Sequence, residues 1–246
     1  MFDQRLYPSQ KYHSASRNSS GFMHALNEHL IHYRDDIVQL KDKVTFTFKG
    51  PTVPLPRPAL PNVSLEHVLE NRRSQRDFVH NPMTLKNLAT LLHYSAGYKH
   101  TEAKRKYVPS SGGMNSVEVF AFVLSSEEIP LGVYHYSSFN HELEEINLGD
   151  YREWLKTHVF FQQEFSQASV VIVLTSMIGK LTKKYLMRSY RLGLIDVGHV
   201  SQNIYLACAA LDLKVCASAG FIDHEVDEAL KIDGDENASF LTIMVN

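Results

Sequence analysis

Short runs of β-branched and aromatic residues recur through the second half of the chain, and each run is bounded by polar residues. Runs of this length and composition are typical of β-strands with at least one buried face. The pattern predicts strands over residues 117–124, 132–137, 168–175 and 239–245. Between the last two runs lies a long stretch with a different spacing, which indicates a helix.

Apolar residues three to four positions apart predict three helices in the main part of the chain. The first follows Ser64, whose side chain can cap a helix, the second ends at Gly97, and the third is a central helix within residues 184–213. The apolar positions are Leu65, Val68 and Leu69 in the first helix, Leu85, Leu88, Leu91 and Leu92 in the second, and Leu194, Val197, Val200 and Ile204 in the third. Together with the strands, these helices predict an α+β fold in which helices pack on a mostly antiparallel sheet.

The first 61 residues are expected to form an N-terminal extension. Phe22, Leu26, Leu30 and Tyr33 lie near one face of a helical repeat. The stretch FKGPTVPLPRPALPN, residues 48–62, then holds five of the nine prolines and favours an extended strap over a helix. We therefore divide the chain into a helical extension with a proline-rich strap, residues 1–61, and a main domain, residues 62–246.

Composition and charge exclude several classes of function. The formal net charge of −2 gives no electrostatic reason to expect nucleic acid or an anionic membrane as a partner. The N-terminus lacks the apolar segment of a secretory signal and no apolar run has transmembrane length, so we expect a cytoplasmic protein. Cys208 and Cys216 have no C-x-x-C spacing, which favours small buried residues over a disulfide or metal site. Any redox chemistry would then need a bound cofactor.

The segment NRRSQRDF, residues 71–78, concentrates hydrogen-bond donors where the first predicted helix ends. Arg72, Arg73 and Arg76 lie with Ser74 within five positions. Guanidinium groups form bidentate, charge-assisted contacts with phosphate, so this composition suits a terminal phosphate group. The alternative is a cationic helix terminus that interacts only with the helix dipole.

The segment VPSSGGMNS, residues 108–116, is a turn-rich loop directly before a predicted strand. Its glycines permit close backbone approach, and Ser110 and Ser111 add hydroxyl donors, so the loop could border a planar ligand. It could equally be a simple approach to a hairpin. The chain has no G-x-G-x-x-G or Walker A pattern, which counts against a Rossmann or P-loop nucleotide site.

The segment KKYLMRSYR, residues 183–191, combines cations with phenols. A tyrosine accepts a proton only if its phenolate is stabilised, and a cation such as Lys184 or Arg188 could lower the pKa of Tyr185 in a dry pocket. Taken alone, a Lys-Tyr pair is more often structural or exposed.

Two further groups of polar residues carry weaker signals. His24, His29 and His32 do not have the ligand spacing of a zinc or di-iron site, so no metal site is predicted. A basic cluster is expected to be a solvated loop, although it could face an anionic partner. Its members are Lys99, Lys104, Arg105 and Lys106.

Seven segments, taken in order, resemble the SagB-type branch of the flavin-dependent nitroreductase superfamily, which includes the azoline dehydrogenases that make thiazoles and oxazoles. Together they span essentially the whole chain. They are YHSAS (12–16), RRSQRDF (72–78), PSSGG (109–113), LGVYHYSSFNHELEEI (131–146), KYLMRSYR (184–191), GHVSQNIYLACAALDL (198–213) and GFIDHEVDEALKIDGDE (220–236).

The resemblance implies a homodimer with FMN at the subunit interface, on a central antiparallel sheet flanked by helices. It implies that the arginine segment contacts the FMN phosphate and ribityl chain, that the P-S-S loop lies against the cofactor from the partner subunit, and that a backbone stretch approaches the isoalloxazine ring. The corresponding residues here are Arg72, Arg73, Ser74 and Arg76; Pro109, Ser110 and Ser111; and Ala219 and Gly220. The acidic residue of simple nitroreductases is absent from the last stretch, which counts against a nicotinamide-dependent reaction.

The same resemblance makes Lys184 and Tyr185 the catalytic motif. It implies FMN-dependent oxidation of a peptide-derived thiazoline or oxazoline to the aromatic azole, with the flavin reoxidised by oxygen. The peptide would be presented by a cyclodehydratase complex or tethered to an acidic carrier domain that docks on basic segments near residues 104–106 and 180–184. Two alternatives stay open: a nitro, quinone or enone reductase driven by NADH or NADPH, and a catalytically idle flavin-fold scaffold of a biosynthetic complex.

Overall fold

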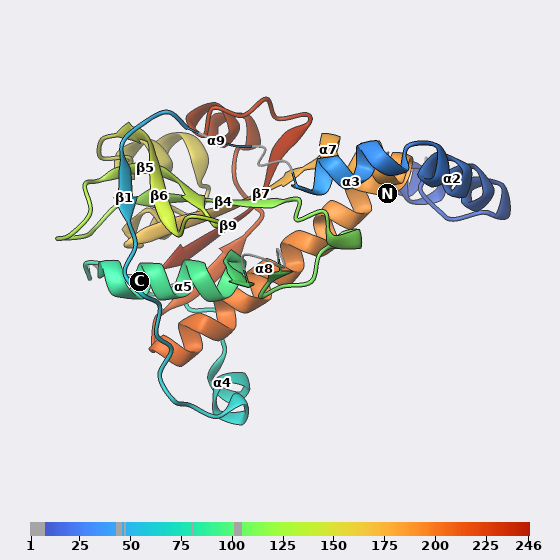
Figure 1. Cartoon of the computed structure of the whole chain (residues 1–246). Coiled ribbons are helices and arrows are strands. Elements are labelled where there is room, and N and C mark those ends of the chain that lie inside the picture. The colour runs from blue at the N-terminus through green and yellow to red at the C-terminus, as the bar shows by residue number, and fades with distance from the viewer. Residues whose placement is uncertain (1–7, 43–45, 47, 80, 101–104) are drawn as a thin grey trace.

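The main body of the protein is a seven-stranded antiparallel sheet covered by helices on both faces (Figure 1). The computed structural model describes residues 8–42, 46, 48–79, 81–100 and 105–246. The strand order is β1-β6-β5-β4-β7-β9-β8, and β2 and β3 form a separate two-stranded ribbon. The strands are β1 (Thr52–Pro54), β2 (Tyr98–His100), β3 (Arg105–Lys106), β4 (Val117–Val123), β5 (Gly132–Ser137), β6 (Glu142–Leu148), β7 (Val170–Met177), β8 (Val215–Ser218) and β9 (Asn237–Val245).

The helices of the described residues fall into an N-terminal group and a group that packs on the sheet. None of them is long and apolar enough to cross a membrane. The α-helices are α1 (Pro8–Ala15), α2 (Ser20–His32), α3 (Arg34–Asp42), α4 (Leu65–Asn71), α5 (Leu85–Ala96), α6 (Arg152–Trp154), α7 (Ile178–Tyr185), α8 (Ser189–Leu211) and α9 (Asp223–Ala229). Shorter helical turns are Ser111–Gly113, Leu155–Val159, Gln163–Gln167 and Leu186–Arg188.

The central strand β7 is buried on both faces, which explains its unbroken apolar sequence. Ile172 and Leu174 belong to the core on the side of α5 and α8. Val171 and Val173 belong to the core on the opposite side, which includes Val226 of α9. Alternation along one strand therefore supplies two hydrophobic layers.

The structure confirms most of the predicted elements. Ser64 Oγ accepts a hydrogen bond from His67 N at 3.1 Å at the start of α4, and α5 ends at Gly97. The central helix predicted within residues 184–213 is α8, which begins only at Ser189 because α7 ends at Tyr185 and a short turn follows. Strands β1, β6 and β8 were not predicted. The first is part of the proline-rich strap and pairs with β6.

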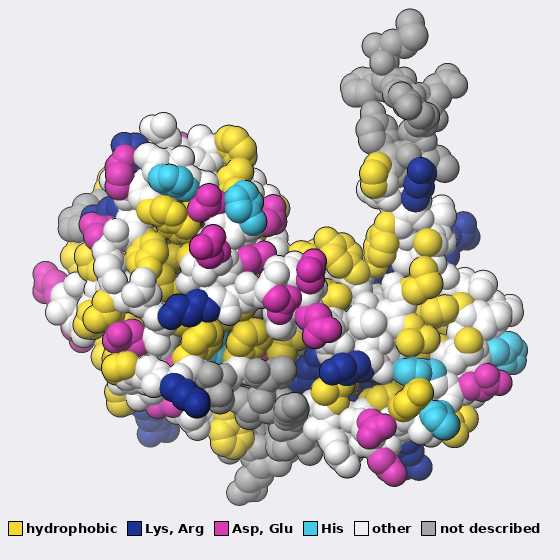
Figure 2. All heavy atoms as spheres, turned by 90° about the horizontal axis from the view of Figure 1, so that it is seen from above, with side chains coloured by type: hydrophobic (Ala, Val, Ile, Leu, Met, Phe, Trp, Pro, Cys, Tyr) yellow, Lys and Arg dark blue, Asp and Glu magenta, His cyan; other side chains and the backbone are white. Residues whose placement is uncertain are grey.

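The N-terminal helices lie beside α7 (Figure 1), and the view from above shows hydrophobic side chains at the surface of this part of the molecule (Figure 2). Arg188 Nη1 donates a hydrogen bond to Ser16 O at 2.7 Å, and Arg191 Nη2 donates to His13 O at 3.1 Å and to Ser16 Oγ at 2.6 Å. A ring nitrogen of His29, on α2, lies 2.7 Å from Lys183 O. Arg188 and Arg191 donate to carbonyl groups at the C-terminal end of α1, where a helix leaves carbonyl groups without intrahelical partners. The extension is thus attached to the segment that follows Lys184.

A buried ionic group occupies the sheet face opposite α8. His135 is hydrogen-bonded through Nδ1 to Glu144 Oε2 at 2.8 Å and through Nε2 to Glu118 Oε2 at 3.1 Å. The ring centroid of Phe120 lies 5.0 Å from that of His135. Burial alone would lower the pKa of His135, but hydrogen bonds and charges from Glu118 and Glu144 raise it to about 9. The imidazolium is therefore the stable form at neutral pH.

This arrangement predicts a pH-dependent stability. Because the pKa of His135 is raised from 6.5 to about 9, its contribution of about 3 kcal/mol is fully present below pH 6.5 and is lost as the pH rises through 9. We expect His135→Gln to lower the free energy of unfolding markedly at pH 6 and much less at pH 10, as measured by urea denaturation. His199→Gln, at an exposed position of α8, is the control. An equal loss at both pH values would show that the ion pairs are not the cause.

Candidate active site

Lys184 and Tyr185 are the last two residues of α7, directly before the turn that separates α7 from α8. Leu186 has a φ of 52°, in the region that residues other than glycine rarely adopt. This conformation ends α7, and the turn Leu186–Arg188 leads into α8. The pair therefore lies at the end of a helix and not within one.

The pair faces the turn Ser111–Gly113, in the predicted loop of residues 108–116. Lys184 Nζ donates a hydrogen bond to Gly112 O at 3.0 Å. Gly112 has a φ of 55°, and a Cβ atom placed on it would overlap both Lys184 Nζ and the Tyr185 hydroxyl. The structure thus brings the Lys-Tyr pair and the glycine-containing loop together within one chain.

The surroundings favour the neutral form of both side chains. Burial lowers the pKa of Lys184, and the positive charge of Lys41 on α3 lowers it further. Burial raises the pKa of Tyr185, and the negative charge of Asp196 on α8 adds to the effect. The prediction that a neighbouring cation lowers the pKa of Tyr185 is therefore wrong. Arg188, one of the two cations considered, is engaged by α1.

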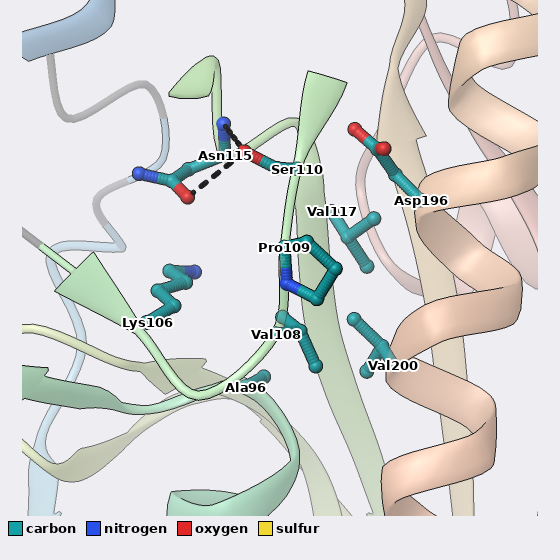
Figure 3. Close-up of a pocket in the computed structure, with 9 residues that line it drawn as sticks. All are labelled: Ala96, Lys106, Val108, Pro109, Ser110, Asn115, Val117, Asp196 and Val200. Atoms are coloured by element: carbon teal, nitrogen blue, oxygen red, sulfur yellow. Dashed lines mark hydrogen bonds between the residues drawn. The ribbon is translucent and has the colours of Figure 1, made fainter. Parts of the chain in front are cut away.

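The hydroxyl groups of Ser110 and Ser111 are engaged within the chain. Ser110 Oγ donates to Asn115 Oδ1 at 3.2 Å and accepts from Asn115 N at 3.0 Å (Figure 3). Ser111 Oγ donates to Asp196 Oδ1 at 2.9 Å. Because these hydroxyls already have partners, a ligand that lies against this loop would contact Pro109 and backbone groups.

The arginine segment is anchored to α8 and β8. Ser74 Oγ and Tyr205 OH are hydrogen-bonded at 2.9 Å, and Tyr205 OH accepts from Ala217 N at 2.8 Å. The guanidinium carbon of Arg72 lies 5.7 Å from the centroid of the Tyr205 ring, within the range of a cation–π contact. One tyrosine thus positions the predicted phosphate-binding segment beside β8.

The other two arginines extend this positive region. Burial raises the pKa of the Cys216 thiol on β8, and the charge of Arg76 opposes the rise, which shows that this guanidinium is near the strand. Among the ion pairs of the described residues, none involves Arg72, Arg73 or Arg76. The nearby Asp77 carboxyl has its pKa lowered by the hydrogen bond from Lys214 and, to a smaller extent, by the charge of Arg73.

Ala219 and Gly220 directly follow β8 and are exposed. Gly220 N donates to Ser218 Oγ at 3.0 Å, and a Cβ atom on Gly220 would meet no atom closer than 3.4 Å. The backbone before α9 is thus accessible, at the same strand that anchors the arginine segment.

The predicted site residues form two clusters along α8. One comprises Lys184, Tyr185 and the loop with Asp196, and the other comprises the arginine segment with Tyr205. Asp196 and Tyr205 are nine residues apart, which corresponds to about 13 Å along a helix. Figure 1 shows α7 and α4 near opposite ends of α8. The single chain does not bring these two clusters into contact with each other.

The basic cluster is divided between solvent and the loop. Lys99 and Arg105 are exposed, whereas Lys106 lines a small cavity together with Pro109 and Asp196 (Figure 3). Burial lowers the pKa of Lys106, and the charge of Glu118 opposes this. Lys104, the remaining member, lies outside the described residues.

The structure also places possible metal ligands and the two cysteines. Among the described residues, no three His, Cys, Asp or Glu side chains are close enough to hold a metal ion. Cys208 and Cys216 are free and buried.

Sequence reasoning did not identify Asp196, Tyr205 or Lys41. Asp196 had a detectable signal, because it is a carboxylate among the apolar positions of a buried helical stripe, next to Val197 and one turn from Val200. The roles of Tyr205 and Lys41 depend on contacts between distant segments, for which the sequence has no local signal.

Comparison with known proteins defines the class of this fold and site. Residues 69–245 match the nitroreductase family, and the chain belongs to that family. The antiparallel sheet flanked by helices is therefore a nitroreductase-like α+β fold.

Two similar proteins have names of different kinds. MJ1384 of Methanocaldococcus jannaschii, named as a nitroreductase, is 31% identical over 184 residues, which cover 74% of this chain and 92% of that protein. The microcin B17-processing protein McbC of Escherichia coli is 24% identical over 158 residues, which cover 62% of this chain and 58% of that protein.

Solved structures share the fold. A chain of the E. coli microcin synthetase McbBCD complex, with truncated pro-MccB17 bound, aligns with a TM-score of 0.63 and 20% identity over 99% of this chain and 98% of that one. A nitroreductase of Exiguobacterium sibiricum in complex with FMN aligns with a TM-score of 0.54 and 15% identity over 77% of this chain and 89% of that one.

Gly112 generates a prediction that separates steric overlap from backbone strain. Alanine at position 112 or 113 should each cost about 1–2 kcal/mol of stability, because both glycines have positive φ. Only Gly112→Ala should displace Lys184 and Tyr185, since a Cβ on Gly113 would meet only Lys41 Nζ at 3.9 Å. NMR of ring-labelled tyrosine, with the Tyr185 signal assigned by Tyr185→Phe, should show a shift in the first variant alone. The same Tyr185 signal in the Gly112→Ala and Gly113→Ala variants would contradict the close approach of Gly112 to Lys184 and Tyr185.

Proposed function

We propose that the protein is an FMN-dependent oxidase that converts a peptide-derived thiazoline or oxazoline into the aromatic thiazole or oxazole. The observation that carries this proposal is the meeting of Lys184 and Tyr185 at Gly112. There, a lysine with a lowered pKa and a tyrosine with a raised pKa share one contact. Similarity to McbC, a microcin-processing protein, supports a peptide substrate.

Lys184 is the proposed base. Its neutral amine is favoured by burial and by Lys41, so it can remove the acidic α-proton of the azoline. Tyr185 stays protonated and donates a hydrogen bond to the negative charge that develops beside the α-carbon. The Gly112 carbonyl holds the amine in place through its hydrogen bond.

The residues present fit FMN. The arginines that form no ion pair in the described part of the chain suit its phosphate, and the accessible backbone of Ala219 and Gly220 suits close approach to a flat ring. Arg72, Arg73, Ser74 and Arg76 would hold the phosphate and ribityl chain, and Pro109, Ser110 and Ser111 would border the ring. Bound FMN would supply a two-electron acceptor for the hydride of the azoline β-carbon, with oxygen as the final acceptor and hydrogen peroxide as product.

A homodimer would join the two clusters that the single chain keeps apart. Leu194 and Ile195 are 45% and 48% exposed on α8, and Leu65 and Leu69 are exposed on the neighbouring α4. Exposed apolar side chains on adjacent helices favour a subunit interface. The loop of one subunit could then complete the arginine cluster of the other. In this proposal the peptide is delivered within a complex, as the pro-MccB17-bound McbBCD assembly illustrates for its own chains.

A nicotinamide-driven reductase is the second candidate, because the relative MJ1384 is named as a nitroreductase. Anaerobic mixing of the purified yellow protein with a dipeptidyl thiazoline, a methyl-thiazoline thioester, NADH or NADPH distinguishes the two. Bleaching of the flavin by a thiazoline supports the oxidase, whereas bleaching by a nicotinamide alone supports the reductase. A protein that stays colourless after reconstitution with FMN would exclude both.

Removal of either member of the pair should abolish most turnover. A positioned acid or base contributes about 10²–10⁴-fold, so Lys184→Ala and Tyr185→Phe should each lose that much azoline oxidation and still bind FMN. Lys183→Ala is the matched control, because this neighbour on α7 contributes its backbone carbonyl to His29. Full azoline oxidation in both variants would contradict the assignment.

Substitutions in the arginine segment should weaken the binding of FMN, in contrast to those at Lys184 and Tyr185, which should lower turnover. A hydrogen bond to a charged group contributes about 1.5–3 kcal/mol, so Arg72→Ala and Arg76→Ala should each weaken FMN binding roughly tenfold to a hundredfold. Arg57→Ala, at an exposed position of the strap, should not. Fluorescence titration of the apoprotein with FMN measures the effect, and unchanged affinity in both variants would place the phosphate elsewhere.

A further inference from the structure

We propose that Asp196 is a positioning residue that holds the Ser111–Gly113 turn against the Lys184–Tyr185 pair. Its relevance to turnover rests on the proposed function, whereas its effects on the loop and on Tyr185 do not. None of the sequence segments that carry chemistry includes this residue.

Hydrogen bonds from the loop converge on the Asp196 carboxylate. Ser111 N donates to Oδ1 at 3.0 Å and to Oδ2 at 3.1 Å, Ser111 Oγ donates to Oδ1 at 2.9 Å, and Ser116 Oγ donates to Oδ2 at 3.1 Å. Both carboxylate oxygens are thus used by residues on the two sides of Gly112. A carboxylate that accepts several hydrogen bonds from one loop fixes the conformation of that loop.

Asp196 is buried to 1% exposure in the middle of α8. It projects from the helix toward the loop, in the cavity that Pro109 and Val200 also line (Figure 3). The only partners that the described residues give this carboxylate are a backbone amide and two hydroxyls, so its negative charge is not neutralised by an ion pair. The hydrogen bonds from the loop stabilise this buried carboxylate, and a charge in a low-dielectric interior acts strongly on its neighbours.

The loop transmits this anchoring to the pair. Ser111 is the residue before Gly112, whose carbonyl accepts the Lys184 hydrogen bond. If Ser111 moves, the carbonyl moves with it and Lys184 loses its fixed position. A displacement of about 1 Å at a reacting group can cost about 10²-fold in rate.

The charge of Asp196 acts on Tyr185 directly. The charged groups that face the pair are Asp196 on α8 and Lys41 on α3, and Lys106 of β3 lines the Asp196 cavity. Burial raises the pKa of Tyr185, and Asp196 raises it further. The same carboxylate therefore orders the loop and disfavours the phenolate.

Two substitutions separate these effects. Asp196→Asn keeps a carbonyl oxygen for Ser111 N and removes the charge, whereas Asp196→Ala removes both. Asp212→Asn is the matched control, because it is the same change at the exposed C-cap of the same helix, in a left-handed conformation that asparagine tolerates. All three variants are compared as full-length FMN-loaded protein.

Two measurements need no substrate. In hydrogen exchange followed by mass spectrometry, peptides that cover residues 108–116 should exchange faster in Asp196→Ala, and as in the wild type in Asp196→Asn and Asp212→Asn. In NMR of ring-labelled tyrosine, Tyr185 should titrate at lower pH in Asp196→Asn than in the wild type. Unchanged exchange in Asp196→Ala, or an unchanged Tyr185 titration in Asp196→Asn, overturns the proposal. If Asp196→Ala does not fold, Ser111→Ala with Ser116→Ala tests the anchoring.

A kinetic measurement links the residue to turnover. Azoline oxidation should fall about 10²-fold in Asp196→Ala, chiefly in kcat. In Asp196→Asn the alkaline limb of the pH profile, which reports ionisation of Tyr185, should move to lower pH. If the wild type does not oxidise azolines, the proposed function fails, but the exchange and NMR results still decide the role of Asp196.

Discussion

A single hydrogen bond, from Lys184 Nζ to Gly112 O, joins the two segments on which the candidate active site depends. It forms only because Gly112 has no side chain and because α7 ends at Tyr185, where the backbone of Leu186 turns away. One segment precedes the central strand β4 and the other follows the central strand β7, and these strands are direct neighbours in the sheet. The buried core therefore fixes the distance between the two segments.

Lys41 and Asp196 have opposite charges, yet each favours the neutral form of the neighbouring side chain of the Lys184–Tyr185 pair. Lys41 disfavours a second cation at Lys184, and Asp196 disfavours an anion at Tyr185. In the proposed reaction, a neutral amine removes a proton while a neutral phenol donates a hydrogen bond. Exchange of these protonation states would leave a phenolate next to a carboxylate and an ammonium next to another ammonium, which is electrostatically unfavourable.

Local sequence signals predicted most of the fold. The β-branched runs gave β4, β5, β7 and β9, and the capping residue Ser64 gave the start of α4. The break at Leu186 was not predictable, because apolar spacing continues through it and the left-handed conformation of a leucine depends on its surroundings. Strand β6 was missed because its inward-facing Glu144 is stabilised by His135, a contact between strands that periodicity does not report.

The candidate site was predictable in its residue types and not in its electrostatics. The Lys184–Tyr185 pair and the P-S-S-G-G loop were identified from the chain and its resemblance to a family, and the structure brings them together. The predicted direction of the Tyr185 pKa shift was wrong because it depends first on burial and then on the charge of Asp196, which lies eleven positions later on another helix. The cofactor-binding roles of Arg72, Arg73 and Arg76 stay predictions.

The attachment of α1 to Arg188 and Arg191 has a consequence for how this family is divided into modules. The family match begins at residue 69, yet the segment directly after the Lys-Tyr pair is bound by carbonyl groups of residues 13 and 16. A chain trimmed to the matching region would keep every strand from β2 to β9 and lose the helices that pack beside Lys184, including Lys41 on α3. The boundary of the family match and the boundary of the surroundings of Lys184 are thus different along this polypeptide, because residues 13 and 16 lie before the match.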